Sequence, residues 1–342
     1  MTQPDSPGSP ADRGPTEPAQ PAEPLEPGRR HAPSRAELEA RARATRVEFE
    51  AGVQAARAQF DATNEKIRAR TGRNLIAAIA VGVSLGAALL ASLLIIKWLF
   101  IVFGAALIGF TVFELAGALR IAGRNVPRVA STVVGLAVVP IAFFFHVEGL
   151  WLATLGAVIV LTIYRLLAQL RPLSRRSSRE LARDLGAATF VQIYVTFMAG
   201  FYLALTGSEN GQFWTLASLI IVVATDVGAY AAGLAWGRHK LAPKISPGKT
   251  WEGFAGSLVV AIVAGVLLAV FMLGISPWIG AVMGLLLGLV GTAGDLTESL
   301  IKRDLGVKDI STWLPGHGGF LDRLDSILPS AAVAYAIYLL VT

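Results

Sequence analysis

The chain has 342 residues, of which 54% are hydrophobic and 16% charged, and it contains no cysteine. Soluble domains are on average about 45–50% apolar and about 25% charged, so a soluble domain of this composition would lack the polar residues to cover its surface. The composition also excludes a chain disordered throughout, a disulfide scaffold and any thiolate nucleophile, Cys-ligated zinc or iron–sulfur site. The formal net charge of +6 taken alone favours a nucleic acid or an anionic membrane as partner.

The first 73 residues differ in composition from the rest, because they hold 23 of the 54 charged residues. Residues 1–33 contain nine of the 17 prolines and are predicted to be a disordered tail; they lack the pattern of a secretory signal peptide. Residues 34–73 begin with capping-box spacing at Ser34 and Glu37 and contain no proline, which predicts a charged cytoplasmic helix. A membrane-surface helix and a weak coiled coil are the alternatives for this segment.

From residue 74 onward the chain consists of apolar stretches near the length of about 20 residues that a transmembrane helix needs. We count nine of them, at residues 75–95, 98–118, 127–146, 149–169, 185–206, 213–235, 254–273, 277–297 and 325–342. The sequence therefore predicts an all-α, polytopic membrane protein with about nine transmembrane helices, in which residues 74–342 form one catalytic domain.

The loops between these stretches alternate in charge. Sixteen Lys and Arg residues lie in the loops after the second, fourth, sixth and eighth stretches, whereas residues 145–150 and 206–212 carry none. The positive-inside rule then places the N-terminus in the cytoplasm and the C-terminus outside, which requires an odd number of spans. Lys97, between the first two stretches, is the exception.

Ionisable residues at membrane depth are rare and usually functional. Asp226 lies well inside the sixth stretch, and Asp295 lies at the predicted cytoplasmic end of the eighth. A helix-packing hydrogen bond or a buried ion pair is the alternative for each. Glu114, about one turn from the end of the second stretch, is a weaker candidate, and snorkelling or a pair with Arg120 is the alternative for it.

The sixth loop, residues 237–253, combines four cations with hydroxyls, glycines and two prolines. Gly248-Lys249-Thr250 is similar to the end of a P-loop, but the upstream glycine at the required spacing and the preceding strand are absent from the sequence pattern, so a P-loop is rejected. The loop is a candidate phosphate-binding segment, and binding of anionic headgroups without catalysis is the alternative.

The eighth loop has the highest density of polar residues in the chain. On a helix, Asp295, Ser299 and Lys302 follow the spacing i, i+4, i+7 and share one face. Asp322 and Asp325 are spaced i, i+3, and carboxylates with few other ligand types suit a hard cation such as Mg²⁺.

The same loop contains Gly316-His317-Gly318-Gly319, where glycines allow backbone N–H groups to approach an anion. His317 is a candidate phosphate ligand or acid–base group, and a loop cap is the alternative. Carboxylates for a metal, cations for phosphate oxygens and a glycine loop are together the equipment of phosphoryl or nucleotidyl transfer.

These residues resemble the signature of the phosphatidate cytidylyltransferases, or CDP-diacylglycerol synthases. The resemblance is carried by Ser299, Lys302-Arg303, Lys308-Asp309, His317-Gly318-Gly319 and Asp322-Arg323-Leu324-Asp325, and it extends to Asp226-Val227-Gly228-Ala229-Tyr230 and to residues 243–253. It spans about residues 75–342 without a departure in the signature, and residues 1–73 lie outside it.

The resemblance implies an enzyme of phospholipid synthesis at the cytoplasmic face of the plasma membrane, which makes CDP-diacylglycerol and diphosphate from CTP and phosphatidate. It implies Mg²⁺, with a second cation as an extension, held by Asp295 and Asp322 and with Asp226 and Asp325 as further candidates. The catalytic residues would be Asp295, Asp322, Lys302 and Ser299. The substrate phosphates would be bound by Lys244, Ser246, Lys249, Arg303, Lys308, His317, Gly318, Gly319 and Arg323.

Two rival functions use the same residues differently. A polyprenol or phytol kinase shares part of the pattern, but the complete run over residues 299–325 argues against it. A transporter would use Asp226 and Asp295 as coupling-ion sites, but the polar residues collect at one predicted face and no paired interrupted segments indicate inverted repeats. The partners expected are therefore CTP, phosphatidate and the bilayer, with no nucleic acid; small residues in the spans are compatible with a homodimer.

Overall fold

A computed structural model describes residues 75–171, 175–307, 310–311, 313 and 318–342, with side chains from Ala80 onward. The predicted tail and charged helix of residues 1–73 lie outside the described residues.

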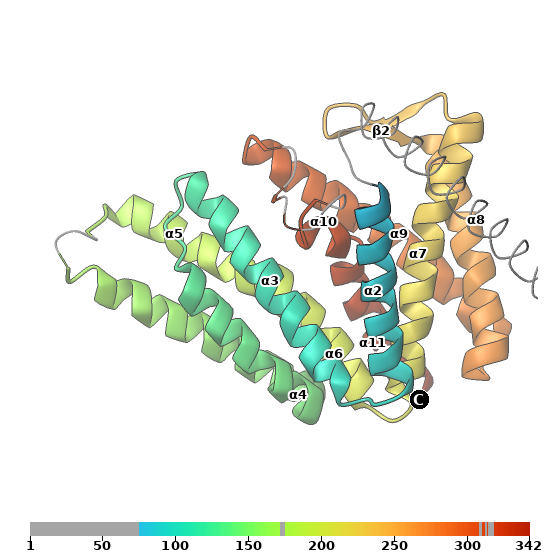
Figure 1. The fold of residues 1–342 in the computed structure, drawn as a ribbon, viewed down its shortest axis with the longest axis horizontal. Helices are drawn as coiled ribbons and strands as arrows, with labels where there is room; N and C mark the ends of the chain where they lie inside the picture. The colour runs from blue at the N-terminus through green and yellow to red at the C-terminus, as the bar shows by residue number, and fades with distance from the viewer. Residues whose placement is uncertain (1–74, 172–174, 308–309, 312, 314–317) are drawn as a thin grey trace, which may run out of the picture. The chain divides into compact units, whose positions relative to one another are not determined.

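The described chain is almost entirely helical (Figure 1). Its helices are α2 (Leu75–Leu94), α3 (Leu99–Ile121), α4 (Arg128–Ala168), α5 (Ser178–Val191), η2 (Gln192–Phe197), α6 (Met198–Gly207), α7 (Gly211–Trp236), α8 (Trp251–Leu268), η3 (Ala269–Leu273), α9 (Pro277–Asp304), α10 (Leu321–Leu324) and α11 (Ile327–Val341). The prediction of a helical protein is confirmed, with one addition: the sixth loop forms a small antiparallel hairpin of β1 (Lys240–Ala242) and β2 (Ser246–Thr250).

Seven helical segments within the described residues are long and apolar enough to cross a membrane. They are Leu99–Ile121, Arg128–Ala168, Ser178–Gly207, Gly211–Trp236, Trp251–Leu273, Pro277–Asp304 and Leu321–Val341. Helix α2 contributes a shorter apolar stretch, Ala80–Leu94.

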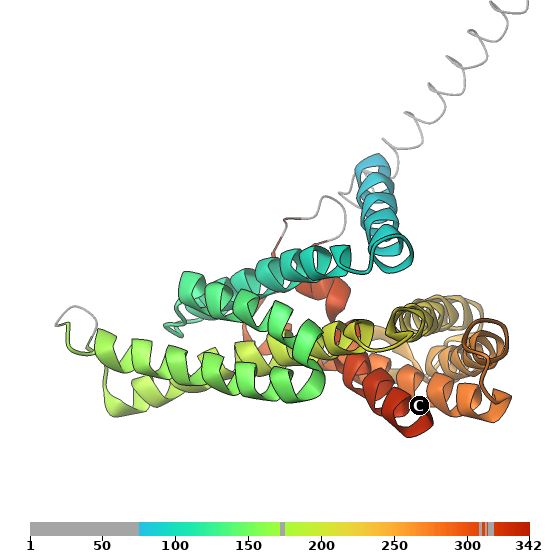
Figure 2. The same cartoon turned by 90° about the horizontal axis from the view of Figure 1, so that it is seen from below.

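Helix α4 is interrupted at His146, where the backbone has φ 52° and ψ −140°. A non-glycine residue at positive φ cannot continue an α-helix, and the chain folds back there, so that its two halves diverge from a common end (Figures 1 and 2). The 41-residue segment therefore consists of two helical halves, which matches the sequence boundary expected between residues 146 and 149.

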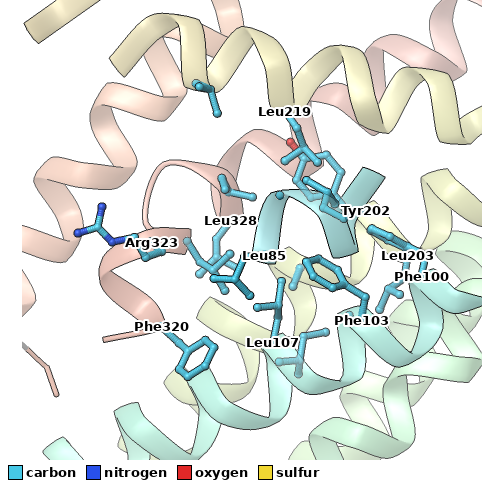
Figure 3. A pocket seen from close by; sticks show the side chains of 18 residues that line it. Leu85, Phe100, Phe103, Leu107, Tyr202, Leu203, Leu219, Phe320, Arg323 and Leu328 are labelled. Atoms are coloured by element: carbon cyan, nitrogen blue, oxygen red, sulfur yellow. The ribbon is translucent and has the colours of Figure 1, made fainter. Parts of the chain in front are cut away.

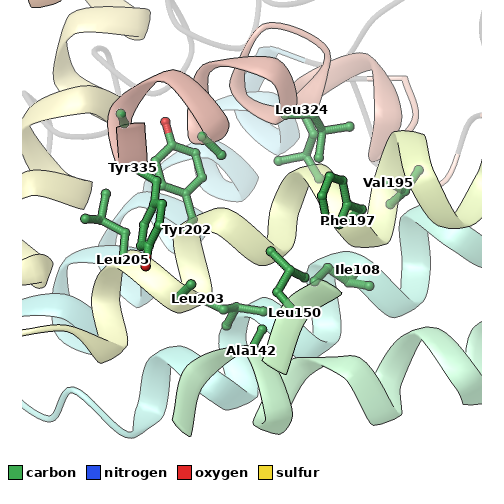
Figure 4. Close-up of a cluster of buried hydrophobic side chains, with 14 of the residues drawn as sticks. Ile108, Ala142, Leu150, Val195, Phe197, Tyr202, Leu203, Leu205, Leu324 and Tyr335 are labelled. Atoms are coloured by element: carbon green, nitrogen blue, oxygen red, sulfur yellow. The ribbon is translucent and has the colours of Figure 1, made fainter. Parts of the chain in front are cut away.

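The hydrophobic core lies where α3, α4, α6 and α11 meet (Figure 4). Ile108, Leu150, Leu203 and Leu205 are at most 2% exposed. In a membrane protein such a core is held by close packing rather than by exclusion of water. It fixes α3 and α11, which carry or adjoin the polar residues described below.

Helices α7, α8 and α9 pack side by side in chain order. Gly265 of α8 and Gly280 of α9 face one another so closely that a Cβ on either would overlap the other's backbone. Small residues at such positions let helix backbones approach closely, so that dispersion contacts between the backbones hold the helices together. In this chain they serve packing within the protein.

Lys97 lies in the turn between α2 and α3, and its Nζ donates hydrogen bonds to the carbonyl oxygens of Gly207 (3.3 Å) and Ser208 (2.7 Å). These carbonyls belong to the end of α6, where a helix has acceptors without donors. Partial burial lowers the pKa of Lys97. The one basic residue that departed from the charge alternation therefore caps a helix.

A buried ion pair joins α4 to α5. Arg165 Nη2 lies 2.6 Å from Asp184 Oδ2, and the two side chains are 4% and 2% exposed. Asp184 Oδ1 also accepts a 2.7 Å hydrogen bond from the backbone N–H of Asn125. Helix α5 itself begins at the capping box of Ser177 and Glu180.

Candidate active site

A polar cavity of about 540 Å³ lies between α7, α8, α9, α10 and the β-hairpin. Its charged lining residues come from segments far apart in the sequence: Asp226, Lys249, Asp295, Asp322, Arg323 and Asp325. In Figure 1 the hairpin lies at the same end of the helices as α10 and the last turns of α9. The structure thus gathers four of the carboxylates that the sequence singled out around one space.

The hairpin places Lys249 over α9. Lys240 pairs with Thr250 across the two strands, and the Thr250 hydroxyl then accepts from the Gly253 N–H (3.1 Å) and caps α8. Because β2 is fixed at this end, Lys249 reaches α9 and its Nζ lies 2.7 Å from Asp295 Oδ2. The predicted anion-binding loop is therefore connected directly to the predicted metal-binding carboxylate.

Asp295 and Ser299 share a face of α9 as predicted, and Ser299 Oγ donates a long, 3.4 Å hydrogen bond to Asp295 Oδ1. Lys302, expected on the same face, has other partners. Its Nζ lies 2.6 Å from Glu298 Oε2 and 2.8 Å from Asp322 Oδ1. Lys302 therefore joins α9 to α10 instead of facing Asp295.

Glu298 is a functional candidate that the sequence reasoning did not select. Its side chain is 1% exposed, and its Oε1 has no hydrogen-bond partner among the described residues. The available signal was its position four residues before Lys302, the spacing of a helical ion pair. A buried carboxylate is costly without a counter-charge, so Lys302 and Glu298 stabilise one another.

Glu114 of α3 is buried at 3% exposure and binds the segment that leads into α10. Its Oε2 accepts a 2.9 Å hydrogen bond from the Leu321 N–H, and its Oε1 accepts from the Ser311 hydroxyl. Gly319 passes so close to this carboxylate that a Cβ there would overlap it. The alternative in which Glu114 only snorkels or pairs with Arg120 is wrong, because the buried carboxylate binds Leu321 and Ser311 of the signature segment.

Asp322 is held from two sides. Besides the Lys302 ammonium, its Oδ2 accepts a 2.8 Å hydrogen bond from the Gly319 N–H. Gly318, the preceding residue, has φ +80°, a conformation that glycine adopts without strain. The glycine pair therefore contacts a carboxylate of its own loop.

Asp226, Asp325 and Arg323 complete the wall of the cavity. The carboxylate of Asp325 accepts a 2.6 Å hydrogen bond from the Ser326 N–H. Asp226, on α7, is exposed and accepts no hydrogen bond from the described residues. Its carboxylate is thus available to a ligand of the cavity.

Three further predicted phosphate ligands belong to α9 and to the hairpin. Arg303 Nε donates to the Ile245 carbonyl (3.3 Å) and so ties α9 to the hairpin turn. Lys244 in that turn is exposed, and Ser246 is half-buried in β2. The structure does not bring Lys244, Ser246 or Arg303 into the lining of the cavity. Lys308 and His317 lie outside the described residues.

The donor set of the cavity fits Mg²⁺ by its chemistry, because the charged ligands that it offers to a cation are carboxylate oxygens, which hard cations prefer. Within the described ranges, no three or more His, Cys, Asp or Glu residues are grouped so that they could hold a metal ion by themselves. Mg²⁺ usually takes one or two carboxylates together with waters and substrate phosphates. The side chains that would hold it are Asp295 and Asp322, with Asp226 and Asp325 beside them.

The sequence model of the cytidylyltransferase family matches residues 76–341. A phosphatidate cytidylyltransferase of Mycobacterium bovis is 42% identical over 276 residues, which are 79% of this chain and 90% of the relative. That of Mycobacterium leprae is 42% identical over 277 residues, covering 78% and 88% of the two chains. A phosphatidate cytidylyltransferase of Brucella suis is 43% identical over 143 residues, 42% of this chain and 53% of its own length.

Proposed function

This chain belongs to the cytidylyltransferase family, and we propose that its polar cavity is the site where CTP and phosphatidate react. The activity is that of a phosphatidate cytidylyltransferase, a nucleotidyltransferase of phospholipid synthesis, which forms CDP-diacylglycerol and diphosphate. The observation that carries the assignment of the site is the cavity wall itself, where Lys249, Asp295, Asp322 and Arg323 meet although they come from three separate segments.

In this reaction a phosphate oxygen of phosphatidate attacks the α-phosphorus of CTP. The new bond joins that oxygen to the α-phosphorus, and the bond from the α-phosphorus to the oxygen that bridges it to the β-phosphorus breaks, so that diphosphate leaves. The nucleophile is already an anion and needs no strong base. The barrier comes from bringing two anions together, and cations lower it by neutralising charge as it moves to the leaving group.

The residues of the cavity supply that charge pattern. Arg323 and Lys249 are cations on its wall, and each binds substrate phosphate oxygens in our proposal. Lys302, held between Glu298 and Asp322, stands behind the wall, where it positions Asp322 and in our proposal adds positive charge near the substrate phosphates. Mg²⁺, held by Asp295 and Asp322, would neutralise the triphosphate; Ser299 then orients the Asp295 carboxylate through its hydrogen bond.

We also propose that the chain crosses the plasma membrane nine times. The seven apolar segments become eight when α4 is divided at His146, and α2 is the ninth. The hairpin and the end of α9 lie at the opposite end of the helices from the bend in α4 (Figure 1). The basic loops belong to the end that carries the hairpin. The positive-inside rule therefore puts the cavity and the N-terminus at the cytoplasmic face and the C-terminus outside.

The test is an assay of purified protein in detergent micelles with labelled CTP, phosphatidate and either Mg²⁺ or EDTA. We expect label in CDP-diacylglycerol with Mg²⁺ and none with EDTA. Asp295→Asn and Asp322→Asn are expected to abolish this product at normal protein yield, whereas Glu209→Gln, an exposed residue in the connection between α6 and α7, should leave it unchanged. Near-normal turnover by both aspartate variants would refute the assignment of the site.

The same assay separates the rival activities. With CTP labelled at its γ-phosphate, a polyprenol in place of phosphatidate should give no labelled lipid, and a labelled, phosphorylated polyprenol would reverse the assignment to a lipid kinase. Flux of a solute through proteoliposomes without any chemical product would instead support a transporter.

A further inference from the structure

A second cavity, of about 320 Å³, lies beside the polar one and is lined almost entirely by apolar side chains. Its walls come from α2, α3, α6, α7, α10 and α11. Figure 3 shows Leu85 of α2 turned toward Phe103 and Leu107 of α3, with Leu328 of α11 close by. The volume lies at the lower end of the range of ligand pockets, about 300–1,000 Å³, and the lining suits a hydrocarbon.

Arg323 lines both cavities. Its aliphatic stem adjoins the apolar lining, and Figure 3 shows its guanidinium pointing away from the labelled apolar side chains. An arginine placed in this way keeps its methylenes on an apolar surface and its charge in a polar space. Arg323 therefore marks the boundary between a phosphate-binding space and a hydrocarbon-binding space.

We infer that the apolar cavity binds an acyl chain of the phosphatidate substrate while Arg323 contacts its phosphate. This inference rests on the proposed function, because it assigns the second part of the same lipid. Only an amphiphile with an anionic head and a hydrocarbon tail satisfies both spaces at once. A nucleotide has no group for the apolar cavity, and a lipid with a neutral head offers no anion to the polar space into which the Arg323 guanidinium points.

Helix α2 forms the outer wall of the acyl site. Gly86 and Leu89 line the cavity, whereas Val83 and Leu94 are 66% and 54% exposed and face away from the protein. The acyl chain therefore lies one helix away from the surrounding lipid.

Gly86 provides a specific test, because a Cβ at this position meets no atom within 4 Å. A phenylalanine there enters the cavity without displacing neighbours. Gly156 of α4 is the matched control: it is also a half-buried helical glycine with nothing within 4 Å of its Cβ, but it does not line the cavity. Both variants carry the same loss of a glycine and the same added ring.

The experiment compares Gly86→Phe and Gly156→Phe with dipalmitoyl and dihexanoyl phosphatidate at saturating CTP. For Gly86→Phe we expect the KM for the dipalmitoyl lipid to rise roughly tenfold or more, because each methylene excluded from an apolar site lowers affinity about fourfold. The KM for the dihexanoyl lipid should change less than about twofold, because its short chains place few methylenes in the cavity. The KM for CTP should also change less than about twofold, because CTP places none there. Gly156→Phe should match the wild type with both lipids.

A photo-crosslinking measurement covers the case in which Gly86→Phe fails to fold. Phosphatidate with a diazirine near the end of one acyl chain is irradiated with wild-type protein, and the labelled peptides are identified. Label on α2 and on residues 100–108 supports the acyl site. Equal KM values for Gly86→Phe and Gly156→Phe, or label confined to outer helix surfaces as expected of surrounding lipid, would overturn it. Failure of the proposed function is distinct, since the wild type would then form no CDP-lipid from either phosphatidate.

Discussion

Lys302 and Asp322 are joined by a 2.8 Å hydrogen bond between Nζ and Oδ1, although they lie 20 residues apart on different helices. The same ammonium contacts Glu298, which is buried. One cation is thus held between two carboxylates at the point where α9 meets α10. This arrangement gives the site a fixed positive charge and holds Asp322 at the cavity, and it makes Glu298 a positioning residue.

The first prediction concerns Glu298→Gln. The substitution keeps the size of the side chain but removes one of the two charges that fix Lys302, so we expect kcat to fall by about tenfold or more, as when one positioned electrostatic group is lost. The KM for CTP should change little, because Glu298 itself does not line the cavity. Initial rates of CDP-diacylglycerol formation over a range of CTP concentrations measure both. A kcat within twofold of that of Glu209→Gln would show that Glu298 has no such role.

The sequence predicted much of the site and less of its internal pairing. Helical periodicity placed Asp295 and Ser299 on one face. Because they are four residues apart on α9, their side chains can form a hydrogen bond. Periodicity has no information on contacts between helices, so it could not show that Lys302 turns to Asp322 and that Asp295 is met by Lys249 from the hairpin. The small β-hairpin was missed because its two prolines and lysines are typical of a loop.

The fold shows the same division between local and long-range information. Apolar stretches and their boundaries follow from composition, and even the break at His146 falls where two stretches were expected. Burial of polar residues depends on what packs against them. Glu114 and the pair of Arg165 with Asp184 were therefore not predictable as buried, since their partners are contributed by distant segments.

The second prediction is that Glu114→Ala lowers both stability and activity. It leaves the buried N–H of Leu321 without an acceptor, which costs about 1–3 kcal/mol of the free energy of unfolding. Leu321 begins the helix that carries Asp322, so the carboxylate should lose its fixed position as well. Thermal unfolding in detergent and initial rates measure the two effects. Glu114→Gln keeps an acceptor for this N–H and should restore most of both; equal losses in the two variants would contradict the role of the hydrogen bond.

The third prediction separates stability from catalysis. Arg165→Met leaves the buried Asp184 without its main counter-charge, and removing one partner of a buried pair costs about 3–5 kcal/mol. Turnover per folded molecule should stay at the wild-type level, because neither residue lines the polar cavity. Adding Asp184→Asn removes the uncompensated charge and keeps the acceptor for Asn125, so the double variant should be more stable than Arg165→Met. A double variant that is less stable would show that the charge of Asp184 is needed for another reason.

The last prediction concerns the contact between the hairpin and α9. Lys249→Met should raise the KM for CTP, because a cation of the cavity wall is lost, and Asp295→Asn should remove turnover almost completely. If the two side chains act as one unit, through their 2.7 Å ion pair, the double variant should be hardly less active than Asp295→Asn alone, since effects of groups that act together are not additive. Sensitive end-point assays of CDP-diacylglycerol with high enzyme concentrations measure the residual rates. Losses that multiply would mean that Lys249 binds substrate independently of Asp295. Lys240→Met, on the exposed side of the same hairpin, is the matched control, and it should leave the KM for CTP unchanged because the charge removed does not line the cavity.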